Sequence, residues 1–206
     1  MISGFVRHLF PRVVLRRNMR LSYTLCLGGL AFTSILVLVV TGTLLLFYYR
    51  PSPGVAYESV VYLESNVWGG AFVRSLHRLA SHALLVLIGL HTLRVLLTGA
   101  YRPPREWNWV IGAGLLFAVL AQAYVGYLLP MDQMAYWATH TGMEIVRLLP
   151  FGGTLRGLLV PDRIGGPLSL IRFYAFHVAV LPGAILGLSA LHFFTIRKQR
   201  GLLPYL

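Results

Sequence analysis

The sequence predicts an all-α membrane protein, built as a bundle of four transmembrane helices. Of its 206 residues, 57% are hydrophobic and only 12% are charged, and the mean hydropathy is +0.70. About 25% charged residues is usual for soluble domains. Four apolar stretches are long enough to cross a hydrocarbon core of about 30 Å. They lie at about 22–48, 73–98, 109–129 and 171–195.

The four spans are helices because each must satisfy its own backbone hydrogen bonds in lipid. None of them shows the alternation of apolar and polar residues that marks a barrel strand. The first span follows a basic tail, as a signal peptide would. It is too long for one and lacks a small-residue cleavage pattern, so we expect it to stay in the mature protein. No repeat divides the chain, and residues 1–206 form one transmembrane domain.

Basic residues predict the topology. Ten Lys and Arg lie in the N-terminal tail, the loop between the second and third spans, and the C-terminus. The positive-inside rule places these segments, and so both termini, in the cytoplasm. Five of the six acidic residues lie in the other two loops. The charge therefore indicates a multi-pass protein of a bacterial inner membrane or a thylakoid-like membrane, in contact with anionic lipid and not with nucleic acid.

The two loops on the far side differ in character. The first begins with the turn-rich stretch YYRPSPG. The second has about 40 residues, from Pro130 to Leu170, in which apolar residues alternate with a few charged ones. This composition predicts one or two short amphipathic helices at the membrane surface.

Four histidines occur at matched depths in the second and fourth spans. His77 and His91 are 14 residues apart, so they return to within about 40° of one helix face, about 21 Å apart. His177 and His192 are 15 apart, about 60° off and about 22 Å apart. Because the two helices run in the same direction, His77 can face His177 and His91 can face His192.

A single histidine in a membrane helix is usually a hydrogen-bonded packing residue. Four at two depths are harder to explain in this way, because each polar group in hydrocarbon costs free energy unless it is satisfied. Facing imidazoles suit a flat metallocofactor, and haem iron takes axial His ligands. Zinc fits poorly, because each level offers only two ligands. The spacing therefore predicts two haems, each held by two histidines, between the second and fourth spans.

The other three histidines are not expected to be ligands. His82 is five residues after His77, which turns it about 140° away. His8 and His140 lie outside the spans, and His140 is a weak candidate only because of its place in the long loop.

Glycines repeat the histidine step in the two remaining spans. Gly28 and Gly42 are 14 residues apart, and so are Gly112 and Gly126. A residue without a side chain lets a large ring approach the backbone. Glycine is also common wherever transmembrane helices touch, but two pairs at this step favour a role beside the haems.

Arginines flank the histidines. Arg74 and Arg78 lie beside His77, and Arg94 follows His91 by three residues. A guanidinium group at these positions could pair with haem propionates, and we group Arg197 in the basic C-terminal segment with them. The alternative is that these side chains reach for lipid headgroups.

Several motifs resemble a known family. The segments FVRSLHRLASH, GLHTLRVLLTGAYRPPREWNWVIGAGL, GYLLPMDQMAYWA and RFYAFHVAVLPG resemble cytochrome b of quinol:cytochrome c oxidoreductases. The resemblance covers about residues 23–201 and is closest to the short, split "b-six" type. It implies that His77 and His177 bind the haem on the positive side, and that His91 and His192 bind the haem on the negative side.

Cys26 is the only cysteine, which excludes an internal disulfide. A lone cysteine in a transmembrane helix is usually a small buried apolar residue. However, the segment YTLCLGGL is similar to the one through which b-six proteins bind an extra haem by a single thioether. Cys26 also lies within about two turns of the basic end of the first span, near the depth of His91 and His192. We therefore expect one covalent c-type haem in addition to two b haems.

The resemblance also locates a quinol pocket beside the third span. Family members read P-W-D-Q here, whereas this chain has Pro130, Met131 and Asp132, so a methionine replaces the aromatic ring that borders the pocket. A P-E-W-Y motif, which completes the quinol-oxidising site, is absent. In split systems it belongs to a separate three-helix subunit.

The resemblance implies an electron-transfer subunit that acts only within an oxidoreductase complex. Quinol would give one electron to a Rieske iron-sulfur partner and one across the membrane, with cytochrome c or a similar protein as the final acceptor and a dimeric complex as the assembly. An alternative is a two-haem membrane anchor that passes electrons between quinone and a multihaem partner. A haem-free structural or transport bundle is a third, and it would be colourless.

Overall fold

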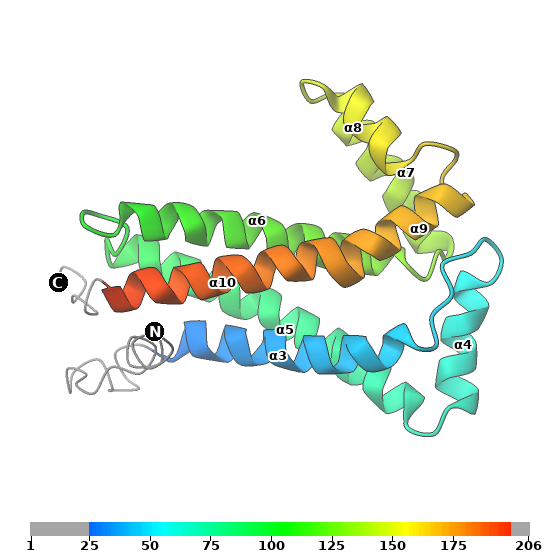
Figure 1. Cartoon of the computed structure of the whole chain (residues 1–206), viewed down its shortest axis with the longest axis horizontal. Helices are drawn as coiled ribbons and strands as arrows, with labels where there is room; N and C mark the ends of the chain where they lie inside the picture. Colours follow the sequence, from blue (N-terminus) through cyan, green and yellow to red (C-terminus); the bar gives the residue numbers. More distant parts are fainter. Residues whose placement is uncertain (1–24, 199–206) are drawn as a thin grey trace, which may run out of the picture.

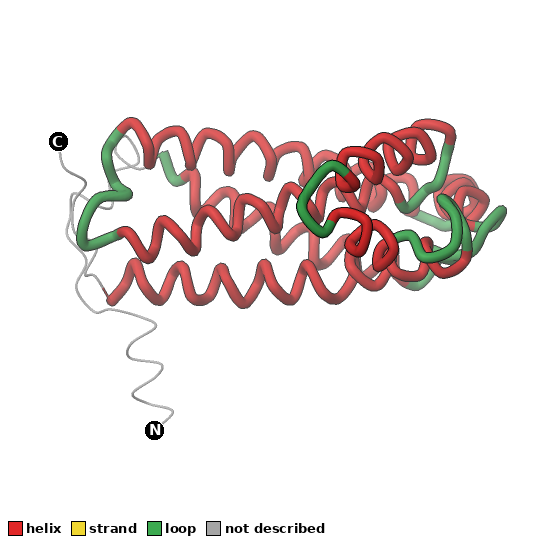
Figure 2. Tube along the Cα trace, turned by 90° about the horizontal axis from the view of Figure 1, so that it is seen from above, coloured by secondary structure: helices red, strands yellow, loops and turns green. Residues whose placement is uncertain are grey.

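The computed structural model describes residues 25–198 and contains four long helical spans side by side (Figures 1 and 2). Three are single helices: α3 (Leu27–Leu46), α5 (Gly70–Leu97) and α6 (Glu106–Leu128). The fourth, Pro167–Lys198, combines α9 (Pro167–Ala175), the π-helical turn η2 (Phe176–Val180) and α10 (Leu181–Lys198). The predicted all-α, four-helix membrane fold is confirmed.

The spans alternate in direction along the chain (Figure 1). α3 and α6 begin, and α5 and α10 end, at one end of the bundle (Figure 1). α3 packs mainly against α5, and α6 packs mainly against α10. An edge-to-face contact between Phe32 and Phe193, with ring centroids 5.1 Å apart, connects the two helix pairs.

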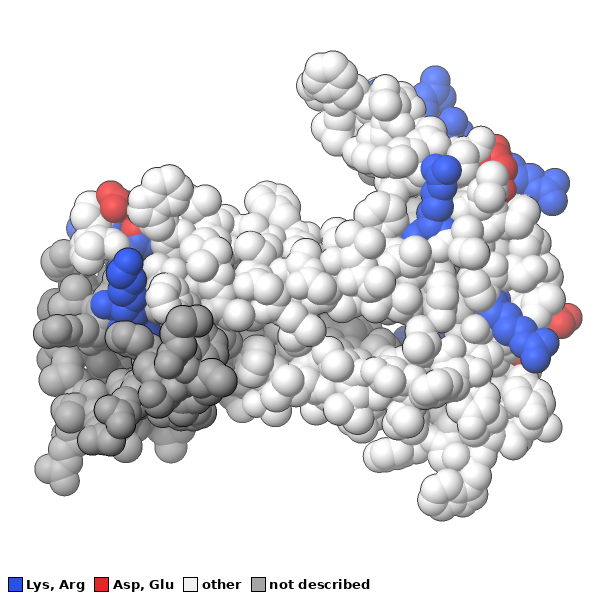
Figure 3. Space-filling model, in the orientation of Figure 1, with Lys and Arg blue, Asp and Glu red and all other residues white. Residues whose placement is uncertain are grey.

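The outside of the bundle is apolar. Each span turns a large apolar side chain outward with more than half of its surface exposed, for example Val40, Val86, Phe117 and Val180. Lys, Arg, Asp and Glu gather at the two ends, and the long middle section seen in Figure 3 is nearly free of them. Such a belt is stable against lipid and costly in water, so the chain is an integral membrane protein.

An apolar layer fills the middle of the bundle. It consists of one buried residue from each span: Ala31, Leu84, Val119 and Ile185. Leu84 lies seven residues after His77 and seven before His91, so this layer separates the two histidine levels. Its side chains carry no polar atoms.

The far-side loops contain more helix than their composition suggested. The predicted surface helices of the long loop are α7 (Gln133–Arg147) and α8 (Gly152–Leu159), which project sideways beyond the end of α6 (Figure 1). The sequence did not predict α4 (Ala56–Asn66) in the first loop. Packing explains α4, because a Cβ atom on Gly70 of α5 would overlap the backbone carbonyl of Leu63.

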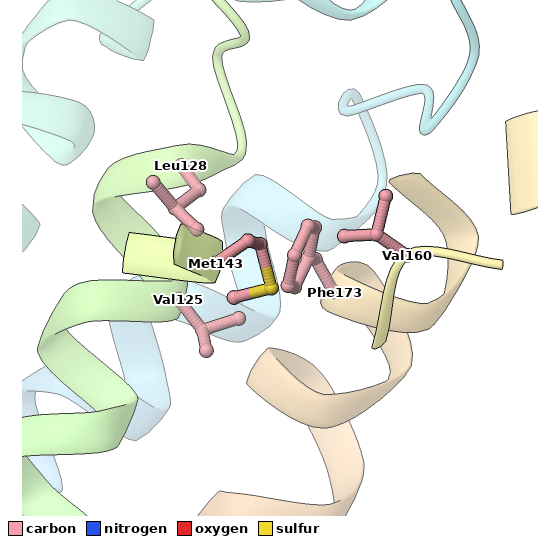
Figure 4. Close-up of a cluster of buried hydrophobic side chains, with 5 residues drawn as sticks. All are labelled: Val125, Leu128, Met143, Val160 and Phe173. Carbon is pink, nitrogen blue, oxygen red and sulfur yellow. The ribbon is translucent and has the colours of Figure 1, made fainter. Parts of the chain in front are cut away.

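A second apolar cluster attaches the long loop to the bundle. Met143 of α7 packs with Phe173 of α9 and with Val125, Leu128 and Val160 (Figure 4). Phe173 is only 1% exposed and Leu128 is fully buried. This cluster fixes the segment after α6, where the sequence places the quinol pocket.

Candidate haem-binding sites

Helices α5 and α10, with the π turn, bring the four histidines together as two pairs. The ring centroids of His77 and His177 are 6.4 Å apart with an angle of 72° between the planes. Those of His91 and His192 are 6.5 Å apart at 78°. These are the pairs that the spacing predicts. Within residues 25–198, no three His, Cys, Asp or Glu side chains gather as a metal site, so each level offers two ligands.

The pair distances match one metal ion between two imidazoles. A bond from a metal to an imidazole nitrogen is about 2 Å long, and the nitrogen lies about 1 Å from the ring centre, so two axial rings have centroids about 6 Å apart. The ring centroids of the two histidine pairs are 6.4 and 6.5 Å apart. Both levels therefore fit an iron held from opposite sides, as in haem with two histidine ligands.

Each histidine packs against a glycine of a neighbouring span. A Cβ atom would lie 3.4 Å from His91 Cε1 at Gly28, 3.2 Å from His77 Cε1 at Gly42, and 3.3 Å from His192 Cε1 at Gly112. At Gly126 it would overlap His177, whose Nδ1 would be only 2.9 Å away. The predicted glycines thus border the paired histidines, and α3 and α6 form the walls behind them.

On the far side, hydrogen bonds hold both histidine rings. Thr41 Oγ1 lies 2.8 Å from Nδ1 of His77 and donates to the carbonyl of Val37 at 2.7 Å. Its hydroxyl proton is thereby used, so Nδ1–H of His77 donates and Thr41 accepts. Nδ1 of His177 donates in the same way to the backbone carbonyl of Gln122 at 3.2 Å. In both rings Nε2 is then the nitrogen with a free lone pair for a metal.

The basic-side level matches these partners only in part. The positions 14 residues before Thr41 and Gln122 are Leu27 and Asn108. Leu27 has no hydroxyl to accept a hydrogen bond. The backbone of Asn108 approaches His192, but Nδ1 of His192 is buried without a hydrogen bond of ordinary geometry among the described residues.

A π turn directly at His177 adjusts the step of the fourth span. η2 covers Phe176–Val180, and the N–H of Leu181 donates to the carbonyl of Phe176, five residues back. A π turn takes up one extra residue without changing the direction of the following helix. The 15-residue step from His177 to His192 therefore places the rings like the 14-residue step in α5. The expected offset of about 60° assumed a regular α-helix, and the π turn departs from that assumption.

The predicted arginines occupy different surroundings. Arg74 forms an ion pair with Glu64 of α4, and the side chain of Arg78 is exposed. Arg94 lies close enough to His91 to act on it electrostatically. Arg197 is in the last turn of α10, at the same end of the bundle as Arg94.

Cys26 lies at the beginning of α3, on the basic-side end. It is the N-cap residue, with a left-handed backbone at φ 49°, and it is exposed. Gly28, two residues later, contacts His91. The thiol is therefore at the level of the His91 and His192 pair.

The segment from Leu129 to Asp132 is held in a fixed conformation. The phenol of Tyr49 donates to the carbonyl of Leu129 at 2.6 Å, and burial together with neighbouring Tyr174 raises the pKa of Tyr49, so it remains a donor. Met131, after Pro130, has φ 49°, and a Cβ atom added at Gly165 would lie 3.5 Å from its side chain. Asp132 accepts from the N–H of Ala135 at 2.8 Å and caps α7.

The remaining histidines lie apart from the pairs. His82 and His140 are exposed, and the ring of His140 contacts Trp137. His8 lies outside the described residues. Sequence reasoning missed Thr41 and Gln122. Their positions in the sequence could have identified them. Thr41 directly precedes Gly42, and Gln122 is one helical turn before Gly126.

Comparison with known proteins agrees with these features. A model of the family described as Cytochrome b/b6/petB matches residues 13–200. The menaquinol:cytochrome c reductase cytochrome b subunit of Bacillus subtilis (strain 168) is 42% identical over 181 residues, which are 86% of this chain and 80% of that protein. Cytochrome b6 of Heliobacterium mobile is 41% identical over 175 residues, 84% of this chain and 82% of that protein.

A solved structure shares the fold. A chain of a hyperthermophilic respiratory Complex III superposes with a TM-score of 0.83 at 23% identity. The match covers 96% of this chain and 52% of that one, so this chain spans about half the length of the solved relative. The resemblance inferred from the motifs is confirmed, and the chain belongs to the cytochrome b/b6 family.

Proposed function

We propose that this chain is the transmembrane electron-transfer subunit of a quinol:cytochrome c oxidoreductase, active only within that complex. The observation that carries the proposal is the pair of histidine levels, with ring centroids 6.4 and 6.5 Å apart and a glycine behind every ring. The relatives named as menaquinol:cytochrome c reductase subunits and as cytochrome b6 support this class of complex. Residues 1–206 act as one transmembrane domain.

Membership of the family implies haem b. We assign one haem to His77 and His177 on the positive side, and one to His91 and His192 on the negative side. When bound, the haems supply one-electron redox chemistry at two depths of the membrane. The protein supplies axial nitrogens, fixes their protonation through Nδ1, and excludes water with the apolar layer of Ala31, Leu84, Val119 and Ile185.

Glycines and arginines complete the two sites. Gly28, Gly42, Gly112 and Gly126 leave room for the ligand rings against α3 and α6. We assign Arg74 and Arg78 to the propionates on the positive side, and Arg94 and Arg197 to those on the negative side. Binding there requires Arg74 to share its charge between Glu64 and a propionate.

We assign a c-type haem, attached by one thioether, to Cys26. The thiol is exposed, and its level is that of His91 and His192 through the contact of Gly28. Quinone reduction belongs near this group on the cytoplasmic side. A denaturing gel stained for haem peroxidase activity tests the attachment: the 23.0 kDa band should stain, and a Cys26→Ala variant should lose the stain and keep two dissociable haems.

Quinol oxidation belongs at the opposite end, beside Pro130, Met131 and Asp132. The left-handed backbone of Met131 and the cap made by Asp132 give this segment a defined shape next to the His77 and His177 level. Half of the pocket must come from elsewhere, namely a three-helix subunit with the P-E-W-Y motif. A Rieske protein, a cytochrome c-like acceptor and a second copy of the complex complete the assembly.

Topology follows from charge. The loop with Arg102 and Arg105 and the last turn of α10 with Arg197 and Lys198 lie at the end where α3 begins (Figure 1), so we place this end, and with it the termini, on the cytoplasmic side. Quinol oxidation at the other end then releases its protons outside the cytoplasm.

A pyridine haemochrome spectrum of the purified complex tests the central proposal. Two b haems are expected for each copy of this chain, and one c haem beyond those of any c-type cytochrome in the complex. Replacing all four histidines by alanine should remove both b haems. A complex that kept both low-spin centres after that change would contradict the assignment.

A further inference from the structure

We propose that Gln122 is a positioning residue for the His177 ligand, and that it acts by satisfying a backbone carbonyl that the π turn leaves open. This inference rests on the proposed role of His177 as a haem ligand. Gln122 lies on α6, one turn before Gly126, and it contacts His177 through two separate hydrogen bonds.

The carbonyl of His177 has no donor within its own helix. In an α-helix it would accept from the N–H of Leu181, four residues on. That N–H instead donates to the carbonyl of Phe176. In a π register the donor would be residue 182, which is a proline and has no N–H. A buried carbonyl without a partner costs free energy comparable to a lost hydrogen bond.

Gln122 supplies the missing donor. Its Nε2 donates to the carbonyl of His177 at 2.9 Å, and its own backbone carbonyl accepts from Nδ1 of His177 at 3.2 Å. Of the two ends of the amide, only the NH2 group can donate to a carbonyl, so this contact determines the orientation of the amide. The side-chain oxygen of Gln122 is buried without a partner among the described residues, which leaves the His177 carbonyl as the contact that holds the amide.

The two bonds form a clamp on one residue. One fixes the backbone of His177 relative to α6, and the other fixes the ring through Nδ1. A hydrogen bond from Nδ1 to a carbonyl raises the basicity of the ligating nitrogen and stabilises the oxidised metal. Loosening the backbone contact weakens this effect, so we expect loss of the amide to raise the midpoint potential of the positive-side haem.

The other level provides a matched control. Asn108 is 14 residues before Gln122 on the same helix and faces the His192 level. His192 lies within the regular helix α10, where its carbonyl accepts from the residue four positions on. The carbonyl of His192 therefore does not lack a donor, and the side-chain amide of Asn108 is not needed to supply one.

Redox titration and EPR spectroscopy of the whole complex test the proposal. His77→Ala and His91→Ala variants first assign the two low-spin signals to their levels. Gln122→Met keeps the side-chain length without a donor. At a fixed ambient potential, the oxidised-to-reduced ratio of the positive-side haem should fall roughly three- to tenfold, which corresponds to a rise in its midpoint potential of up to about 59 mV. Its EPR signal should also shift, while the negative-side centre stays unchanged.

Asn108→Leu should leave the positive-side centre as in the unmodified complex. An assembled Gln122→Met complex with an unchanged positive-side centre, or with equal shifts at both levels, would overturn the proposal. If Gln122→Met does not assemble, Gln122→Asn, whose amide is too short to reach His177, should give the same shift. Loss of both centres in both variants would indicate a general folding role and also overturn it. Absence of two low-spin signals in the unmodified complex would instead contradict the proposed function.

Discussion

The two histidine levels share one ligand geometry and differ in what surrounds it. Their ring centroids are 6.4 and 6.5 Å apart, and glycines repeat at the same 14-residue step behind them. On the positive side, Thr41 and Gln122 hold the Nδ1 atoms. On the basic side, Leu27 stands at the position that corresponds to Thr41, and its side chain offers no acceptor. The backbone of Asn108, in contrast, approaches His192 as that of Gln122 approaches His177.

This difference shows which parts of the two proposed haem sites are repeated and which are specific. The repeated parts, ligands and glycines, decide that a flat group fits. The specific parts decide how strongly each ligand donates to the metal, because hydrogen bonds to Nδ1 tune the ring. Two centres of identical ligation can thereby acquire different potentials, as transfer in one direction across a membrane requires.

Removing a ligand should separate the two levels completely. His177→Ala takes away one of two axial nitrogens, and we expect loss of the low-spin positive-side signal with the negative-side signal retained. His192→Ala should give the opposite result. EPR spectroscopy of the purified complexes measures both outcomes, and loss of both signals in either variant would mean that the levels are not independent sites.

Adding a methyl group behind a histidine ligand should have the next largest effect. The effect should be larger at the positive-side level than at the negative-side level. In Gly126→Ala the new Cβ would overlap the ring of His177, whereas in Gly112→Ala it would lie 3.3 Å from His192. We expect Gly126→Ala to reduce occupancy of the positive-side haem by roughly 10-fold or more, as displaced ligand shells commonly do. Gly112→Ala should lose much less. Haem content per protein, from haemochrome spectra, distinguishes them.

Replacing Thr41 by an apolar residue, as at Leu27 on the basic side, should shift the midpoint potential of the positive-side haem without removing the haem. Thr41→Val takes away the acceptor for Nδ1 of His77, a hydrogen bond of about 1 kcal/mol. We expect the midpoint potential of the positive-side haem to rise, so that its oxidised-to-reduced ratio at a fixed ambient potential falls roughly fivefold. Redox titration measures this change. Thr43→Val removes a hydroxyl that bonds only to the carbonyl of Val39 and should leave the potential unchanged.

Acid should produce the smallest effect, and only at the positive-side end. Asp162 accepts from the N–H groups of Leu168 and Ser169 at the start of α9. Desolvation opposes its ionisation, but hydrogen bonds from Ser169 and Leu168 outweigh it and lower the pKa of Asp162 to about 2. The stabilisation is therefore present above about pH 4, the ordinary range of an aspartate, and is lost as the pH falls toward 2.

Thermal unfolding at pH 7 and pH 3 measures this contribution in the complex. Asp162→Asn should lower stability at pH 7 by about 1 kcal/mol, as for the loss of a helix cap, and by less at pH 3. An equal loss at both pH values would show that the carboxylate charge has no part in holding α9.

Hydropathy and residue steps were sufficient to predict much of this molecule. The four spans depend on length and apolar composition alone, and the pairs His77 with His177 and His91 with His192 depend on helix direction and spacing. The π turn at Phe176 left one signal in the sequence, the 15-residue step from His177 to His192 beside the 14-residue step from His77 to His91. The step alone does not tell a π turn from an offset in a regular helix. α4 was hidden because its stability comes from packing against Gly70, which a local sequence pattern does not contain.

The layer of Ala31, Leu84, Val119 and Ile185 has an electrical consequence. Its low permittivity makes it the region over which a membrane voltage falls, and the two histidine levels lie about 21 Å apart within a core of about 30 Å. One elementary charge moved between them crosses roughly two thirds of the field, worth about 1.5 kcal/mol for each 100 mV. A polarised membrane therefore slows electron passage through this chain in one direction and favours the return.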